Sequence, residues 1–349
     1  MNAPLRIWIL NDQKAGHHNQ SRALALAFGL LGPVEVVTVR CKLRAGGLRY
    51  PLRWALNLAP RLLPLAFFRL FHSGDSLPAG RPDLLISAGG NTTSANAWIA
   101  RQLGCDNLFC GRTRGLRDTL FSGIVTPFEQ HSGDPRYIVA PTPVPINPAD
   151  LAAAARTLRE QLGLGDTRLW SMLVGGEGAG YHYDEADWRR LAAALTALAE
   201  RHGIRWLLAT SRRTGVAGEA LLAGLLDGRA LAAATYAFDK PASRATYQQV
   251  IGAAERHFCT EDSHMMMSEA IATGVPVHTL RPARFKTDPS NQHFIDLYTQ
   301  RGYITRHDIA DLATLTPPAA SPAAAEGAPS LAALAEKLRQ WKSRLPSRG

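Results

Sequence analysis

Four short segments hold residues that could bind or transform an anionic substrate, and each follows a predicted buried strand. The first, residues 11–20 with the sequence NDQKAGHHNQ, contains the titratable side chains Asp12, His17 and His18. Gly16 would permit a tight turn, and a helix beginning near Asn19 would offer unpaired backbone N–H groups. The local alternative is that Asp12 caps the turn, Asn19 caps the helix and both histidines are solvated.

The next two segments suit a phosphate group. Residues 175–180, GGEGAG, place two glycines directly after a predicted strand, where the backbone could approach a ligand closely. Their spacing matches neither GxGxxG nor GxxxxGK[ST], so the glycines alone are a weak signal. Residues 210–214, TSRRT, add hydroxyl and guanidinium groups at a helix start, although an N-cap with exposed arginines is the alternative. The predicted ligands in these two segments are Gly175, Gly176, Ser211, Arg212 and Arg213.

The fourth segment, residues 260–277, reads TEDSHMMMSEAIATGVPV. Ser263 could cap a helix there, and Glu269 would lie about one and a half turns further along. A carboxylate at that position could accept hydrogen bonds from ribose hydroxyls, whereas the alternative is an ordinary solvated glutamate. The methionines are predicted to fill the core and to form a wall against a nucleotide base. The predicted nucleotide contacts are Ser263, His264, Met265, Ser268 and Glu269.

Short apolar runs alternate with amphipathic stretches along nearly the whole chain. Strands are predicted at 5–10, 34–39 and 83–87. The alternation of strands and helices begins again after the proline-rich stretch 141–148. Strands separated by helices of ten or more residues indicate parallel sheets built from right-handed βαβ units. The sequence therefore predicts an α/β protein of two doubly wound, Rossmann-like domains that face a cleft, with ligands at the carboxyl ends of the strands.

The predicted domain boundaries follow from this alternation of strands and helices and from its interruption at the proline-rich stretch. Residues 1–148 form an N-terminal domain that faces the acceptor or a membrane, and residues 149–312 form a C-terminal nucleotide-binding domain. Residues 313–349 form a low-complexity connector, rich in alanine and proline, and a terminal helix over 331–345. A length of 349 residues fits two domains at about 150 residues each.

The composition narrows the function classes. Hydrophobic residues make up 46% of the chain and charged residues 19%, which excludes a disordered chain and a coiled coil. The four cysteines form no CxxC pair, so no zinc ribbon or disulfide framework is expected. The net charge of +10 favours anionic partners, but no helix-turn-helix, RNA-binding signature or lysine-rich run supports nucleic acid. We expect a cytoplasmic protein, because no signal peptide or spanning segment is evident.

Residues 49–72, RYPLRWALNLAPRLLPLAFFRLFH, mix arginines with aromatic residues, and two prolines break them into short helices. Such a segment is too short and too charged to span a bilayer, but it suits the surface of an anionic leaflet. A helical hairpin packed on the first domain is the alternative. If the segment contacts lipid, the protein is peripheral on the inner face of the cytoplasmic membrane. The predicted membrane contacts are Arg53, Trp54, Arg61, Phe67 and Phe68.

These segments carry a resemblance to a known family. Residues 16–20, 175–184, 210–214 and 260–277 resemble the plant mitochondrial-fission proteins that recruit a dynamin-like GTPase, and their bacterial homologues. The resemblance spans most of residues 5–305 and is most specific in the last two of these segments. It implies a scaffold that recruits a partner protein at a membrane.

A more distant resemblance is to two-domain glycosyltransferases of the GT-B fold, especially the peptidoglycan enzyme that adds N-acetylglucosamine to a lipid-linked acceptor. That enzyme has a Gly-His turn after its first strand, as Gly16 and His17 would form here. Its nucleotide-sugar loop has a Ser-Glu helix and then Gly-x-Pro, which is similar to Ser268–Glu269 followed by residues 274–276. The first loop departs from that enzyme because it lacks the run of glycines.

Two functions follow. The first is a metal-independent transferase that moves a sugar from a nucleoside diphosphate to a membrane-linked acceptor, with no cofactor beyond that nucleotide sugar. His17 would be the general base, Asp12 would orient it, and Gly16, Asn19 and Gln20 would face the acceptor. The second is a non-catalytic GT-B-shaped scaffold. A nucleotide-sugar epimerase is a weaker third idea, because neither a dinucleotide fingerprint nor a Tyr-x-x-x-Lys pair occurs in the sequence.

Overall fold

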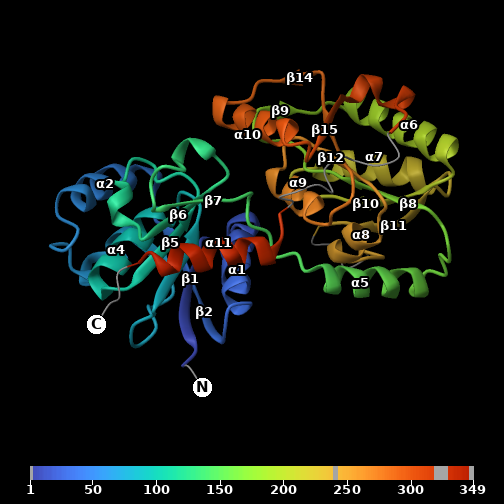
Figure 1. Cartoon of the computed structure of the whole chain (residues 1–349). Coiled ribbons are helices and arrows are strands. Elements are labelled where there is room, and N and C mark those ends of the chain that lie inside the picture. Colours follow the sequence, from blue (N-terminus) through green and yellow to red (C-terminus); the bar gives the residue numbers. More distant parts are fainter. Residues whose placement is uncertain (1–2, 239–242, 318–328, 346–349) are drawn as a thin grey trace. The chain divides into compact units, whose positions relative to one another are not determined.

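The computed structural model describes residues 3–238, 243–317 and 329–345, and it divides the chain into two compact units (Figure 1). Unit 1 comprises residues 1–145 and 329–349, and unit 2 comprises residues 146–328. Most of the predicted low-complexity connector, residues 318–328, lies outside the described residues. The first boundary falls within the proline-rich stretch, and the C-terminal helix belongs to the first unit.

Unit 1 is built on one mostly parallel sheet. Its strands are β1 (Leu5–Asn11), β2 (Val34–Leu43), β3 (His72–Gly74), β4 (Leu84–Ala88), β5 (Asp106–Cys110), β6 (Gly123–Thr126) and β7 (Tyr137–Val139). Their order across the seven-stranded sheet is β3-β2-β1-β4-β5-β6-β7. β2 and β3 pair antiparallel, and the other neighbours are parallel.

Helices cover both faces of this sheet. Successive strand residues point to opposite sides, and apolar residues on both sides need to be covered. The helices are α1 (Ala15–Gly29), α2 (Arg49–Leu58), α3 (Phe68–Phe71), α4 (Thr93–Leu103) and α11 (Leu331–Ser343). In β1, Ile7 and Ile9 join a core cluster with residues of α1 and α11. Trp8 and Leu10 join another with residues of α2, α3 and α4. Such alternation in a buried strand defines a doubly wound sheet.

The C-terminal helix α11 is part of this core, and Figure 1 shows it in red among the blue and cyan N-terminal elements. Trp341 of α11 makes an edge contact with Phe28 at a centroid distance of 6.5 Å. Its Nε1 donates a hydrogen bond to the Ser122 carbonyl at 3.0 Å. A Cβ at Gly123 would lie 2.6 Å from the same Nε1, so glycine makes room for the indole.

Unit 2 has a parallel sheet of its own. Its strands are β8 (Leu169–Leu173), β10 (Arg205–Ala209), β11 (Ala232–Tyr236), β12 (His257–Thr260), β13 (Val277–Arg281) and β15 (Thr305–Asp308). Their order across the six-stranded sheet is β11-β10-β8-β12-β13-β15, and every pair is parallel. β9 (Tyr181–His182) and β14 (Arg284–Phe285) form a separate antiparallel pair.

Helices again lie on both faces of the sheet. They are α5 (Pro148–Gln161), α6 (Glu185–His202), α7 (Gly215–Asp227), α8 (Tyr247–Ala253), α9 (His264–Ile271) and α10 (Pro289–Gln300). The sequence dictates the ends of α6: Asp184 and Asp187 form a capping box, and Gly203 ends the helix at a φ of 61°. α6 packs on α7, whereas α5 packs on α8, as Figure 1 shows. The predicted α/β class with two doubly wound units is confirmed.

Candidate functional site

The carboxyl end of the unit 1 sheet holds a histidine–carboxylate pair where the strand order reverses. β1 lies between β2 and β4, so the chain leaves β1 toward one side of the sheet and later returns to the other. Open parallel sheets bind ligands at such switch points. Asp12 directly follows β1, and its buried carboxylate lies 2.9 Å from Nδ1 of His17 in the first turn of α1.

Three further contacts fix the position of this pair. Nδ2 of Asn91 donates a hydrogen bond to Oδ2 of Asp12 at 3.0 Å, and the backbone N–H of Lys14 donates to Oδ1 at 3.2 Å. The imidazole packs on Gly89, where an added Cβ would lie 2.1 Å from Cε1 of His17. Gly89 also has a φ of 81°, so space and backbone conformation both require glycine.

The electrostatics assign different roles to the two side chains. Burial acts to raise the pKa of Asp12, but the hydrogen bond and charge of His17, with donors from Lys14 and Asn91, bring that pKa below its ordinary value. Because an ionised carboxylate can only accept hydrogen bonds, His17 must donate to it through Nδ1. In the neutral ring, Nε2 is then free to accept a proton. The His17 side chain is 30% exposed, so the ring is accessible.

The rest of the first loop differs from its prediction. α1 begins at Ala15 rather than near Asn19, so Gly16 lies inside the helix and forms no turn. The chain turns instead at Gln13, whose φ is 66°. Asn19 does not cap the helix either, because it lies in the second turn. Gln20 lies on the same helix. The three residues predicted to face an acceptor are therefore all on α1, together with the candidate base His17.

In unit 2, the carboxyl ends of β8, β10 and β12 bring the other three predicted segments together. β8 lies between β10 and β12, where the strand order of this sheet reverses. Gly175 packs on a carboxylate, since an added Cβ would lie 2.1 Å from Oδ2 of Asp262. A Cβ added at Gly176 would lie 2.1 Å from the carbonyl oxygen of Arg213, and Gly176 has a φ of 113°. This close packing accounts for both glycines without a ligand.

Arg213, predicted to hold a diphosphate, is engaged within the protein. Its Nη2 lies 2.6 Å from Oδ2 of Asp262, whose side chain has no exposed surface. The Ser211 hydroxyl donates to the Gly175 carbonyl and accepts from the backbone N–H of Arg213. Arg212 is exposed, and it has no hydrogen bond or ion pair with another described residue. Within the described part of this loop, Arg212 therefore offers the free positive charge.

Asp262, which the sequence analysis did not predict, is the central carboxylate of this edge. The Tyr183 hydroxyl donates to its Oδ1 at 3.3 Å. Burial raises the pKa of Asp262 to about 6, although the guanidinium of Arg213 acts in the opposite direction. Among the described residues, no three His, Cys, Asp or Glu side chains are grouped to hold a metal ion.

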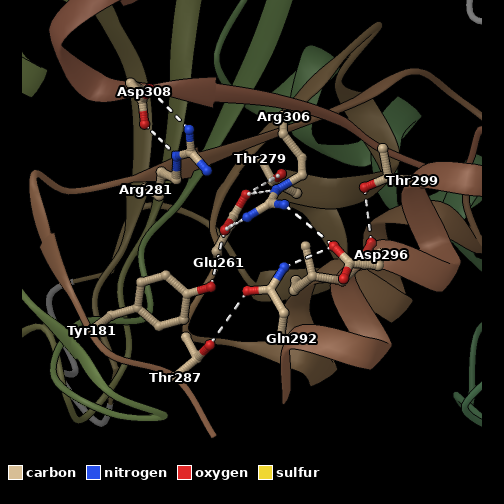
Figure 2. Close-up of polar contacts among 11 residues, drawn as sticks. Tyr181, Glu261, Thr279, Arg281, Thr287, Gln292, Asp296, Thr299, Arg306 and Asp308 are labelled. Atoms are coloured by element: carbon tan, nitrogen blue, oxygen red, sulfur yellow. Dashed lines mark hydrogen bonds and ion pairs between the residues drawn. The ribbon is translucent and has the colours of Figure 1, made fainter. Parts of the chain in front are cut away.

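Glu261, the neighbour of Asp262, is fully buried at the centre of a polar network (Figure 2). Arg306 of β15 binds both carboxylate oxygens, with Nε 2.8 Å from Oε1 and Nη2 3.0 Å from Oε2. Tyr181 donates to Oε2 and Thr279 to Oε1, both at 3.0 Å. Four hydrogen bonds saturate the carboxylate, so it fixes the end of β12 rather than contacting a ligand.

α9 carries the remaining predicted nucleotide contacts. Ser263 occupies the N-cap position but makes no capping hydrogen bond through its side chain, contrary to the prediction. The His264 ring stacks on Phe294 of α10 at a centroid distance of 3.9 Å. Burial lowers the pKa of His264 to about 4, so the ring is neutral near pH 7. Its Nε2 is buried and has no hydrogen-bond partner among the described residues.

The later residues of α9 are more enclosed than expected. Glu269 is buried. Burial raises the pKa of the Tyr247 hydroxyl, and the charge of Glu269 raises it further. The Ser268 hydroxyl is buried without a hydrogen-bond partner among the described residues. Met265 is only half-buried, whereas Met266 and Met267 are buried in the core. Only Met265 among the methionines could form part of a wall against a base.

Two polar residues that complete these sites were missed: Asn91 in unit 1 and Asp262 in unit 2. The signal was present in both places, because GGN follows β4, and Glu261 and Asp262 follow β12. Polar residues at the carboxyl ends of parallel strands lie at the ligand-binding edge of a sheet. Tyr183 could not be found in this way, because it follows the short strand β9 outside the parallel sheet.

The segment 49–72 exposes several large apolar side chains, which we call its apolar face. They are Tyr50, Trp54, Leu58, Leu62, Phe67 and Leu70. Arg61 is exposed among them, and the guanidinium of Arg53 lies over the Tyr50 ring at 5.5 Å. None of the described helices is both long enough and apolar enough to span a bilayer.

Phe68 was wrongly predicted as a membrane contact. It is only 7% exposed and packs in the unit 1 core, stacked on His72 at 4.5 Å and edge-on to Trp98 at 5.4 Å. It begins the single-turn helix α3, which directs it inward while Phe67 stays on the surface.

Solved structures with the same fold were found at low sequence identity. The UDP-GlcNAc 2-epimerase of Methanocaldococcus jannaschii, solved with UDP-GlcNAc and UDP, is 12% identical with a TM-score of 0.53, and the match covers 98% of this chain and 100% of that one. A protein described as a UDP-N-acetylglucosamine 2-epimerase of Listeria monocytogenes is 13% identical with a TM-score of 0.52, over 89% and 87% of the chains. ADP-heptose LPS heptosyltransferase II of E. coli is 14% identical with a TM-score of 0.47, over 96% and 98%. The first two establish the GT-B-type fold of two Rossmann-like units and leave the activity open.

Sequence comparison identifies the family. No curated protein sequence matches the chain. The family model described as mitochondrial fission ELM1 matches residues 15–337, which is most of the 349 residues. The matched range includes His17 and Asn91 of unit 1 and Asp262 of unit 2. The chain therefore belongs to the mitochondrial fission ELM1 family.

Proposed function

We propose that the protein is a GT-B-type glycosyltransferase that moves a sugar from a nucleoside diphosphate to a membrane-linked acceptor. The observation that carries this proposal is the pair of Asp12 and His17, a buried ionised carboxylate that orients an accessible imidazole at a switch point. Inverting transfer needs a base that takes the proton of the acceptor hydroxyl as the glycosidic bond forms. Nε2 of His17 is the nitrogen that would take it.

Unit 2 would bind the nucleotide sugar. Its switch point between β8 and β12, the exposed guanidinium of Arg212 and the uncapped start of α9 at Ser263 support this assignment. A fold neighbour solved with UDP-GlcNAc and UDP is consistent with it. The leaving diphosphate would be stabilised by Arg212 and helix N-termini, so no metal ion should be needed.

The donor site is tested by calorimetry with uridine diphosphate and the full chain. Glu269→Gln keeps the size of the side chain but removes the charge that would accept ribose hydrogen bonds, which are worth about 1.5–3 kcal/mol to a charged group. We therefore expect affinity to fall at least tenfold, and a chelator should leave the parent's affinity unchanged. Glu200→Gln, at the far end of α6, is the matched control. Equal affinity in Glu269→Gln and Glu200→Gln would reject the ribose contact, and loss of binding on chelation would reject the metal-free site.

Membrane attachment is tested with vesicles of anionic lipid. The double variant Trp54→Ala with Leu62→Ala removes two of the most exposed side chains of the apolar face, so sedimentation with vesicles should fall several-fold. High salt should also release the parent protein, because the arginines of the segment attract the anionic surface. Val216→Ala, an equally exposed apolar position in unit 2, should change nothing. Unchanged sedimentation of the double variant would make the apolar face structural only.

The alternative function is a non-catalytic scaffold that recruits a partner protein at a membrane. Membership in the mitochondrial fission ELM1 family favours it, and the apolar face would serve it equally well. The two functions differ in turnover. A scaffold would bind vesicles and a partner protein but would consume no nucleotide sugar in the presence of any lipid-linked acceptor.

A further inference from the structure

We propose that unit 1 binds a phosphate group at Gly90, between the guanidinium groups of Arg49 and Arg114. A Cβ added to Gly90 would lie 3.3 Å from Nε of Arg114 and 3.8 Å from Nη2 of Arg49. The two arginines come from different elements, since Arg49 opens α2 and Arg114 lies in the loop after β5. Gly90 also adjoins Gly89, on which the His17 ring packs, so this position is next to the candidate base.

Neither guanidinium has an ion-pair partner among the residues that the structure describes. The Nε of Arg49 is buried and has no hydrogen-bond partner in the described part of the chain. Arg40, by contrast, is paired with Asp75 at 2.7 Å. Two like charges beside one glycine repel each other, and a buried donor without a partner is costly, so an anion between them would relieve both costs.

The backbone around Gly90 favours an anion as well. α4 begins at Thr93 without an acidic residue in its first turn. Thr92 does not cap the helix, because its hydroxyl donates back to the Ala88 carbonyl. The positive end of the α4 dipole therefore adds to the two arginines. Arg114 has a φ of 57°, a conformation that favours glycine, so local backbone preference does not explain an arginine there.

Phosphate is the anion that this arrangement fits best. Guanidinium groups bind phosphate oxygens through paired, charge-assisted hydrogen bonds, and two of them approach Gly90. The phosphate could be free in solution or esterified to a lipid. Arg49 lies on α2, the helix that also carries the exposed Trp54 of the apolar face. A role for this phosphate in holding the acceptor beside His17 rests on the proposed function, whereas the binding site itself does not.

The test measures pyrophosphate binding to the full chain by calorimetry at low ionic strength. Arg114→Gln and Arg49→Gln should each weaken the binding about tenfold, the loss expected for one charge-assisted contact. Arg6→Gln is the matched control, because Arg6 lies at the amino end of β1, at the opposite edge of the same sheet. Arg114 is exposed, so its variant should fold even if Arg49→Gln does not. All binding is measured in an Arg212→Gln background, so that pyrophosphate held by unit 2 does not obscure the result.

Vesicles containing phosphatidic acid, a phosphate monoester on lipid, form the second arm. A selective loss of vesicle binding in Arg114→Gln would identify a lipid ester, and a selective loss of pyrophosphate binding would identify a soluble phosphate; either result supports the site. Unchanged affinity in both arginine variants, or an equal loss in Arg6→Gln, would overturn it. Because uridine diphosphate binding by unit 2 should be unaffected by Arg114→Gln, the site can fail while the proposed function stands.

Discussion

Replacing His17 with alanine should nearly abolish sugar transfer while leaving donor binding largely intact. A positioned general base contributes a rate factor of roughly a hundred to ten thousand. The donor contacts are proposed on unit 2, whereas His17 lies on α1 of unit 1. The measurement is turnover of a nucleotide sugar with a lipid-linked acceptor, together with calorimetry of uridine diphosphate binding to the variant.

Two variants control this result. His18→Ala changes the adjacent histidine, whose own pKa is lowered by burial and the charge of Arg22, and turnover should stay within a few-fold of the parent. Asp12→Asn keeps the shape of the side chain, but its amide can donate to Nδ1 and so favour the tautomer with the proton on Nε2. It should therefore be nearly as slow as His17→Ala. Turnover of His17→Ala at the parent rate would show that the base lies elsewhere.

Replacing Glu261 with alanine should strongly destabilise unit 2. The change leaves the guanidinium of Arg306, only 19% exposed, and the hydroxyls of Tyr181 and Thr279 without their shared acceptor (Figure 2). Removing one partner of a buried ion pair typically lowers the free energy of unfolding by about 3–5 kcal/mol. For a unit of this size, such a loss lowers the melting temperature by roughly 10 °C, which calorimetry can measure.

The matched control removes the other carboxylate near Arg306. Asp296 lies 3.6 Å from Nη1 of Arg306, but its side chain is about half exposed. Exposed pairs contribute about 0–1 kcal/mol, so Asp296→Ala should shift the melting temperature by a few degrees at most. Equal melting temperatures for Glu261→Ala and the parent would mean that the network does not support the fold.

The fold could be predicted wherever the hydrophobic pattern is strong. The predicted strands at 5–10 and 83–87 match β1 and β4 within one residue at each end. β11 and β15 were missed, because their sequences AAATY and TRHD lack both a continuous apolar run and a strict alternation. Both are edge strands, with one pairing neighbour each, and they need less apolar surface than central strands.

The start of α1 shows where local signals mislead. Asn19 and Gly16 are typical of a helix cap and a turn, so the sequence predicts a helix start four residues later than Ala15, where α1 begins. In the structure the turn is made at Gln13, and the side chain of Asp12 binds the backbone of Lys14 and the ring of His17. This shift puts His17 on the first turn of a helix, which holds it more rigidly than a loop would.

The sequence by itself determined the α/β class, the two doubly wound units and the strand ends at which polar residues gather, because periodicity and strand-to-helix order are local properties of the chain. It also singled out His17 as the candidate base and Asp12 as its partner. Only the tertiary structure decided which charges remain free for a ligand. Arg213 is neutralised by Asp262, whereas Arg212, one residue earlier in the same loop, is not. Such pairing depends on which residues the sheet brings together across 49 positions of sequence, and no local pattern encodes it.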